Sequence, residues 1–475
     1  MGRPEPLQVT VPVETEAVVR QRKAVTGAAL VKGKGLVIEM DLRRLNWRKK
    51  LRLPRGTEIH WEDVRAVDVF ELSSFLSPVW YRVTFGDGWY RDPHGGQRVR
   101  FGVQEHLHGL DLQRCVTTAV IRAAVLLAVM GGVGLRSVCW LLRALFHVEV
   151  SKSSLARWIE EAAGQLPNDE GMIRRLQADK PITEGHLDEI YPRGWDTGCV
   201  LVLKDEHGRI VAAEQIIERS AEHVAPFLQR LRDLGLQIHV FYVDGCEAYR
   251  DAIRAIYPEA VLQYDYFHVL QNIWKKLWKA MVQHRKDLMR RSEKVATPAY
   301  SQKLEALAKT LWESRGLIFK NPDNMTPEEM ERLVAIMEQD RFVGTVRCFI
   351  GRVWGIFRDS DGELGARQRL GRLRRRDEVQ KDPESPFAKA VDFLEERFED
   401  MIAFLRSPGV KRNSLAESGI RVLRRLEQGH DGFRGENGRS NYLRLYQAIK
   451  YCGWRVHRLD GRLTLPPVSA ARSAA

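Results

Sequence analysis

The sequence has few cysteines for its length and no long hydrophobic run. Its 475 residues include six cysteines, none of which belongs to a Cys-x-x-Cys pair. This scatter excludes a disulfide framework, argues against a cysteine zinc site and is typical of a reducing cytosol. The longest apolar run, residues 123–135, lies between Arg122 and Arg136 and is too short to cross a bilayer. We expect a buried helix there and no membrane partner.

Acidic residues are in deficit. The chain has 62 Asp and Glu against 75 Lys and Arg, which gives a net charge of +13. A hydrophobic content of 44% and a charged content of 29% describe a globular protein with room for several domains. Solubility alone accounts for an excess of this size, but the cations gather in four clusters, at 43–55, 275–291, 367–376 and 421–444. Clustering favours a polyanion as partner, and nucleic acid is the commonest.

Residues 1–110 have the alternation and turn residues of a β-rich region. A strand is predicted over 36–40, and a half-buried strand over 98–101. Residues 80–91 predict a hairpin that turns at Gly86-Asp87-Gly88. We interpret this region as a DNA-binding or multimerisation module.

Residues 111–166 change to a helical period. Helices are predicted over 114–128 and 135–146, and a third begins after Ser151, a good N-cap. A short turn followed by a helix with polar and basic residues at its start predicts a DNA-binding helix-turn-helix, although a plain helical hairpin has the same periodicity. The prolines at 167 and 181 predict a linker between this unit and the next.

Residues 182–279 alternate strands and helices in the order β-β-β-α-β-α-β-α, which predicts an antiparallel meander followed by crossover units. Two apolar strands, 240–243 and 261–264, end at Asp244 and Asp265. Open α/β sheets place their ligand chemistry at these strand ends. Helical residues 280–405 follow as an insertion, then 406–455 as the second part of the core, and then a tail at 456–475.

Three carboxylates are candidates for chemistry: Asp188 within a strand, Asp244 at a strand end and Glu417 in a late helix. Carboxylates that converge repel one another, so such a cluster implies bound cations. Each residue also has a simpler interpretation, since Asp244-Gly245 is a common turn dipeptide and Ser414 to Glu417 fits a capping box. Because side chains alternate along a strand, Glu189 is expected on the face opposite Asp188. Composition alone does not select these three acids.

Five short pieces carry a family resemblance. They are His186-Leu187-Asp188-Glu189, Val243 to Tyr249, Asp265-Tyr266-Phe267-His268-Val269, Asn413-Ser414-Leu415-Ala416-Glu417 and Gly432-Phe433-Arg434. Their order resembles that of the DDE transposases of bacterial insertion sequences, and the group with a long helical insertion before the glutamate is the most similar. The acids are 56 (244 − 188) and 173 (417 − 244) residues apart. The resemblance covers about residues 110–455. This sequence departs from many relatives in one respect, since it has no cysteine zinc motif near its N-terminus.

The resemblance implies an α/β fold: an RNase H-like mixed sheet with a large all-α insertion, preceded by the β-rich region and the helix-turn-helix. It implies that Asp188, Asp244 and Glu417 are catalytic and hold two Mg²⁺ ions, with Mn²⁺ as a substitute. His268, Asp265 and Asn413 would lie nearby. The expected DNA-binding residues are Lys152, Ser153, Arg157, Lys275, Lys276, Arg374, Arg375, Arg421, Arg424 and Arg434.

The activity implied is a transposase that binds terminal inverted repeats, cleaves DNA at the element ends and transfers the freed strand to target DNA. Its partners would be double-stranded DNA and further copies of itself, in a dimer or higher assembly, in the cytoplasm at the bacterial nucleoid. Two alternatives remain. One is an inactive or regulatory DNA-binding descendant of a transposase, and the other is a nuclease or resolvase of the same fold that cuts without joining.

Overall fold

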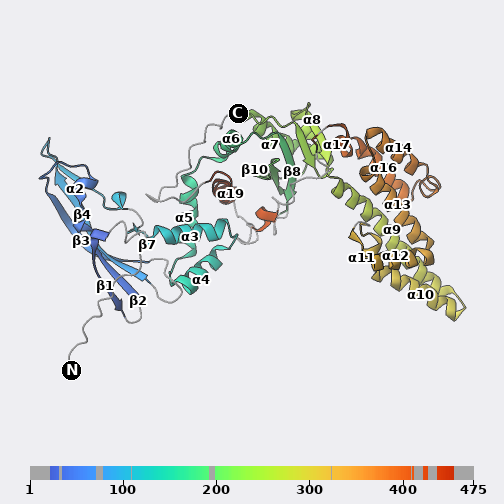
Figure 1. The fold of residues 1–475 in the computed structure, drawn as a ribbon, viewed down its shortest axis with the longest axis horizontal. Coiled ribbons are helices and arrows are strands. Elements are labelled where there is room, and N and C mark those ends of the chain that lie inside the picture. Colours follow the sequence, from blue (N-terminus) through green and yellow to red (C-terminus); the bar gives the residue numbers. More distant parts are fainter. Residues whose placement is uncertain are drawn as a thin grey trace, which may run out of the picture.

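The computed structural model describes residues 22–31, 35–70, 79–107, 110–191, 198–321, 324–407, 409–410, 421–425 and 436–453. The molecule is elongated (Figure 1): a β-sheet lies at one end, a bundle of helices at the other, and a smaller sheet with its own helices between them. No helix in the described parts is long and apolar enough to cross a membrane.

The N-terminal sheet has the strand order β1-β2-β4-β3-β7-β6, with β5 paired to β4. Its core includes Trp47, whose indole N–H donates to the Leu42 carbonyl at 2.7 Å. The β-rich prediction for this region is confirmed. The strands are β1 (Val25–Val31), β2 (Gly35–Asp41), β3 (Ile59–Phe70), β4 (Val79–Arg91), β5 (Arg98–Phe101), β6 (Leu110–Asp111) and β7 (Val116–Thr117), with the short helix α2 (Trp47–Lys50) after β2.

The predicted hairpin over 80–91 is wrong, because β4 runs through these residues as one continuous strand. Gly88 pairs with Phe101 on β5, and any Cβ at position 88 would overlap the Phe101 ring. A Cβ at Gly86 would come within 2.6 Å of the Glu62 carbonyl oxygen. These glycines therefore permit close approach within the sheet instead of turning the chain.

Four helices connect the two sheets: α3 (Thr118–Val129), α4 (Leu135–Phe146), α5 (Lys152–Gly164) and α6 (Asp169–Asp179). The first three pack against one another, and Ser151 caps α5 by accepting the Ser154 N–H at 3.1 Å, as predicted. The linker prediction for 167–181 is wrong. Asn168 accepts the Gly171 N–H at 2.9 Å and so begins α6, whose residues Met172, Ile173 and Leu176 are buried.

The central sheet has the strand order β10-β9-β8-β11-β12. Its strands are β8 (Glu184–Ile190), β9 (Cys199–Lys204), β10 (Ile210–Ile216), β11 (Val240–Val243) and β12 (Val261–Tyr264). The first three pair antiparallel, whereas β11 pairs parallel with both β8 and β12. This is the predicted meander followed by crossovers, made by α7 (Ala221–Asp233) and α8 (Glu247–Ile256). The RNase H-like mixed sheet is therefore confirmed.

Alternate residues of β9 belong to different cores. Val200 and Val202 pack with α3–α5 and with α19 (Glu436–Lys450), whereas Leu201 and Leu203 pack with α7 and α8. The sheet is thus covered on both faces, as parallel strands require. The ends of the parallel strands are therefore the places where side chains can leave the core for chemistry.

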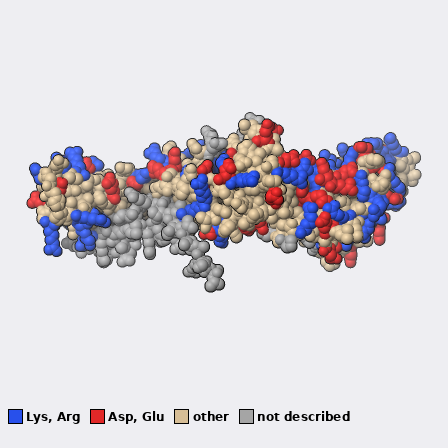
Figure 2. Space-filling model, turned by 90° about the horizontal axis from the view of Figure 1, so that it is seen from above, with Lys and Arg blue, Asp and Glu red and all other residues tan. Residues whose placement is uncertain are grey.

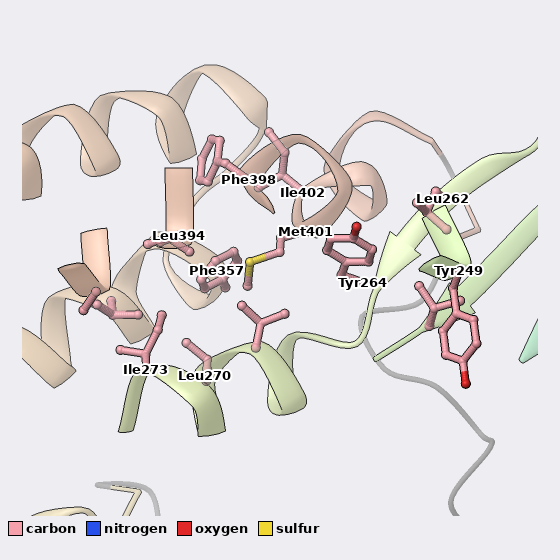
Figure 3. Packing of buried hydrophobic residues seen from close by; sticks show 14 of the residues in the cluster. Tyr249, Leu262, Tyr264, Leu270, Ile273, Phe357, Leu394, Phe398, Met401 and Ile402 are labelled. Carbon is pink, nitrogen blue, oxygen red and sulfur yellow. The ribbon is translucent and has the colours of Figure 1, made fainter. Parts of the chain in front are cut away.

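The insertion was predicted to begin at residue 280, but its first helix, α9 (Tyr266–Lys294), already starts directly after β12; the predicted all-α character is confirmed. Figure 3 shows how apolar side chains of α9, α13 and α16 meet Tyr264 at the edge of the sheet. Sheet and insertion therefore share one core. The other helices of this region are α10 (Pro298–Glu313), α11 (Arg315–Ile318), α12 (Pro327–Gln339), α13 (Arg341–Arg358), α14 (Glu363–Arg374), α15 (Asp377–Gln380), α16 (Pro386–Met401) and α17 (Ala403–Arg406).

Candidate active site

Asp188 and Asp244 lie at the same end of two adjacent parallel strands. Tyr242 on β11 pairs with His186 on β8, and each aspartate comes two residues later in its own strand direction. Beyond β11 the chain turns at Gly245, whose φ of +84° suits glycine, and Asp244 Oδ1 accepts the Cys246 N–H at 3.0 Å. The turn fixes the Asp244 carboxylate at the strand end.

A network of three side chains surrounds the two aspartates. Arg219, in the bend between β10 and α7, contacts Asp244 Oδ2 at 3.1 Å and also forms an ion pair with Glu189. Tyr249 on α8 donates its hydroxyl hydrogen to the other oxygen of Glu189. Glu189 was expected on the face opposite Asp188, but its long side chain reaches the guanidinium that also holds Asp244, so both acids take part in the site.

Burial and like charge set the protonation of the site. Burial and the neighbouring Glu189 carboxylate raise the pKa of Asp188 to about 7, and the charge of Asp244 adds to the effect. The Glu189 N–H, which donates to Asp188 Oδ1 at 2.8 Å, and His268 oppose the rise. Burial and Asp244 likewise raise the pKa of Glu189. The positive charges around these carboxylates therefore do not fully compensate their burial and mutual repulsion.

The donor set fits a hard divalent cation. Within the described residues, no group of three or more His, Cys, Asp or Glu side chains has the geometry of a metal site. However, Asp188 and Asp244 supply carboxylate oxygens, which Mg²⁺ prefers, and one Asp188 oxygen makes no hydrogen bond to any described residue. A buried carboxylate oxygen in that state is suited to a cation. The oxygen ligands that Asp188 and Asp244 offer are therefore of the kind that Mg²⁺ takes.

Asp265 and His268 follow the adjacent strand end. Asp265 is buried, and its N–H donates to the Val243 carbonyl oxygen at 2.7 Å, which ties it to the residue before Asp244. His268 lies in the first turn of α9, close enough to Asp188 to lower its pKa. Both are thus beside the two aspartates. Glu417, Asn413 and Arg434 lie outside the described residues.

The cations expected to bind DNA differ in exposure. Lys152, Ser153 and Arg157 are exposed on α5. Lys275 is exposed on α9, whereas Lys276 lies 5.2 Å from the centre of the Phe393 ring. Arg421 and Arg424 are exposed on the short described segment 421–425.

Many arginines of the insertion are paired within it. Arg374 contacts Asp392 and Glu395, and Arg367 contacts Glu363 and Glu399. Figure 2 shows acidic and basic side chains intermingled over this end of the molecule. Arg375 differs, because it is exposed and lines a shallow hollow of about 440 Å³ with Arg367 and Arg372.

Arg219 and Tyr249 were not predicted as site residues. Tyr249 belongs to the motif Val243 to Tyr249, and its place in the first turn of an amphipathic helix gave a signal for burial but none for a bond to Glu189. Arg219 lies in a bend without any motif, so only the folded chain brings it to the acids.

A family model described as a transposase, of the DDE type and named for ISL3, matches residues 187–436, slightly more than half of the chain. No curated protein matches the chain. Among solved structures, the strand transfer complex of the Drosophila P element transposase is similar to it, with 12% sequence identity and a TM-score of 0.37. That match covers 76% of this chain and 94% of the other.

Proposed function

Because the chain belongs to the ISL3-type family of DDE transposases, we propose that it binds the terminal repeats of its element, cleaves each end and joins the freed 3′ hydroxyl to target DNA. The observation that carries this proposal is the position of Asp188 and Asp244 at adjacent parallel strand ends, with a pKa of about 7 at Asp188. Glu417 would supply the third carboxylate. The alternative is a regulatory DNA-binding protein without activity.

Asp188, Asp244 and Glu417 would hold two Mg²⁺ ions, or Mn²⁺ in their place. When bound, such ions activate the attacking oxygen and stabilise the leaving oxygen of a displacement at phosphorus. The chain's own part is to keep the aspartates in place. The Asp244 side chain is fixed by the Cys246 N–H, and that of Asp188 by the Glu189 N–H. His268 and Asp265 support this arrangement from the start of α9, and Asn413 would contact substrate.

DNA would bind along the molecule through exposed cations. Lys152, Ser153 and Arg157 at the start of α5 would read an element end, as the second helix of a helix-turn-helix does. Arg375 would contact the phosphate backbone, whereas Arg374 is the weaker candidate because it is already ion-paired. The remaining proposed backbone contacts are Lys275, Lys276, Arg421, Arg424 and Arg434.

The N-terminal sheet would bind DNA as well. Arg48, Lys49, Arg52 and Arg55 lie within eight residues, are exposed, and have no ion pair to any described residue. Arg43 and Arg44, by contrast, are paired with Asp41. An exposed group of unpaired cations is the kind of surface that attracts phosphate. We assign residues 1–110 to DNA contact on this basis, with 111–166 as the end-reading unit and a dimer or larger assembly holding two ends.

The test is a strand-transfer assay with the full chain, labelled DNA carrying the ends of the element that encodes it, a target plasmid and Mg²⁺. Cleaved ends joined to the target support transposition, and Asp188→Asn should abolish both products while leaving end binding intact. Cleavage without joints would identify a nuclease. Specific binding with neither product, in the wild type and at any metal concentration, would identify a regulatory protein.

A further inference from the structure

Among the residues that the structure describes, Arg219 is the cation whose contacts join two acids of the site. Its Nη1 atom lies 3.1 Å from Asp244 Oδ2 and forms an ion pair with Glu189. Its guanidinium also lies 5.9 Å from the centre of the Tyr249 ring. About a third of the side chain (33%) is exposed, so the guanidinium borders solvent.

Counting donors at each carboxylate oxygen separates the roles of the acids. Each oxygen of Glu189 has a donor, because one takes Arg219 and the other takes the Tyr249 hydroxyl. Each oxygen of Asp244 likewise has a donor, the Cys246 N–H on Oδ1 and Arg219 on Oδ2. Asp188 has one oxygen without a donor among the described residues. A divalent ion at Asp244 Oδ2 would therefore lie beside the Arg219 guanidinium, whose like charge opposes its binding.

From these contacts we propose that Arg219 is a positioning residue that neutralises Asp244 in the metal-free protein and competes with the divalent ion for its Oδ2 atom. This inference rests on the proposed function, since it assumes that Asp244 is a metal ligand. Glu189 and Tyr249 anchor the guanidinium, so that it swings away from Asp244 without leaving the site. Arg219 thereby sets the affinity for metal.

The chemistry of the side chains supports this assignment. Three partly buried carboxylates within one site repel one another, and one fixed guanidinium offsets part of that repulsion. Arginine remains charged at every accessible pH, so only movement removes its charge from Asp244. An Arg–carboxylate contact that borders solvent can open for an incoming cation, because water resolvates the guanidinium as it moves away.

The experiment measures Mn²⁺ binding to the full chain by calorimetry, without DNA. Arg219→Gln should tighten the Kd for Mn²⁺ by about tenfold or more, as expected for removing a close competing charge. Arg219→Lys keeps the charge but cannot bridge two carboxylates as a planar guanidinium does. Its Kd for Mn²⁺ should therefore lie between those of the wild type and Arg219→Gln. Arg230→Gln is the matched control, because Arg230 pairs with Glu214 on the same domain, away from these acids.

A second readout distinguishes competition from a structural role. The metal-free thermal midpoint of Arg219→Gln should fall below that of the wild type, and saturating Mn²⁺ should restore it. In an Asp244→Asn background the Arg219 substitution should no longer change the Kd. An unchanged or weakened Kd in Arg219→Gln, with Asp244→Asn still lowering the affinity, would overturn this inference alone. If Asp244→Asn leaves Mn²⁺ binding unchanged, both this inference and the proposed metal site fail.

Discussion

The side-chain amide of Gln263 donates a 3.1 Å hydrogen bond to the main-chain carbonyl oxygen of Met401, 138 residues further along the chain. The oxygen of the same amide accepts the Phe404 N–H at 2.9 Å. Gln263 lies on edge strand β12 and is fully buried. It therefore fixes the point where the chain returns from the helical insertion to the catalytic core, thirteen residues (417 − 404) before Glu417.

Gln263→Leu tests this attachment. The substitution removes the hydrogen bonds that the Gln263 amide makes to the Met401 carbonyl and the Phe404 N–H, and a buried polar group left unsatisfied costs about 1–3 kcal/mol. We expect a lower free energy of unfolding in urea and a larger loss of cleavage than of DNA binding. Gln283→Leu is the control, since Gln283 is exposed on α9 and its one side-chain hydrogen bond to a described residue is with Asp287. Equal cleavage by both variants would contradict the positioning role.

The stability of the metal-free protein should depend on Asp188 and pH. Its pKa is raised from 3.8 to about 7 on folding, so between these values the folded state binds the extra proton. Stability is then highest near pH 4, falls as pH rises to about 7 and stays constant above it. The size of the pKa shift limits this change in the free energy of unfolding to about 4 kcal/mol. Asp188→Asn should remove this pH dependence and raise the thermal midpoint at pH 8. A larger midpoint difference between variant and wild type at pH 5 than at pH 8 would refute the raised pKa of Asp188.

Metal binding should release the same proton. Since Mg²⁺ binds the ionised carboxylate, the affinity for metal and the cleavage rate should both rise with pH up to about 7 and level off above it. The rate is measured at saturating DNA with titrated Mg²⁺. A rate that is flat from pH 5.5 to 8 would show that Asp188 is already ionised in the folded protein.

Arg375 and Arg374 provide a neighbouring pair that differs in ion pairing. Arg375→Gln should reduce the slope of log affinity against log salt by about one, as expected for one lost phosphate contact. Arg374→Gln should change that slope less, because Asp392 and Glu395 already neutralise the side chain. Fluorescence anisotropy over a series of salt concentrations measures both, and the reverse order would reassign the DNA surface of α14.

The exposed cations of the N-terminal region (Arg48, Lys49, Arg52 and Arg55) are tested in the same way. The combined substitution of Arg48, Lys49 and Arg55 by Gln should lower the salt slope by about two to three. The matched control replaces Arg43 and Arg44, which are paired with Asp41. If the control weakens DNA binding as much as the substitution of Arg48, Lys49 and Arg55, the number of nearby positive charges determines DNA binding, and the lack of an ion pair does not.

The sequence was sufficient for elements whose pattern is local. The strands around Asp244 and Asp265 and the cap at Ser151 were predicted because periodicity and capping chemistry act over a few residues. The hairpin prediction at Gly86 and Gly88 was wrong, because a glycine that makes room for a neighbouring side chain such as Phe101 looks the same in the sequence as one that turns the chain. The prolines around α6 misled in the same way.

Contacts between distant residues were beyond local patterns. Alternation correctly separates the backbone directions of Asp188 and Glu189, but it does not describe how far a glutamate side chain reaches, nor that Arg219 arrives from another connection. Only the family resemblance linked Asp188 with Asp244 across 56 residues, and Glu417 rests on that resemblance alone.

The central claim is that Asp244 binds a catalytic divalent ion. It is tested most directly by comparing Asp244→Cys with the wild type in the cleavage assay, in Mg²⁺ and in Mn²⁺. A thiolate is a poor ligand for hard Mg²⁺ but binds Mn²⁺ better. We predict that Asp244→Cys loses more than about 100-fold of its rate in Mg²⁺, beyond the loss usual for residues that only support a ligand, and regains much of it in Mn²⁺. Equal rates for the variant and the wild type in Mg²⁺ would contradict the claim.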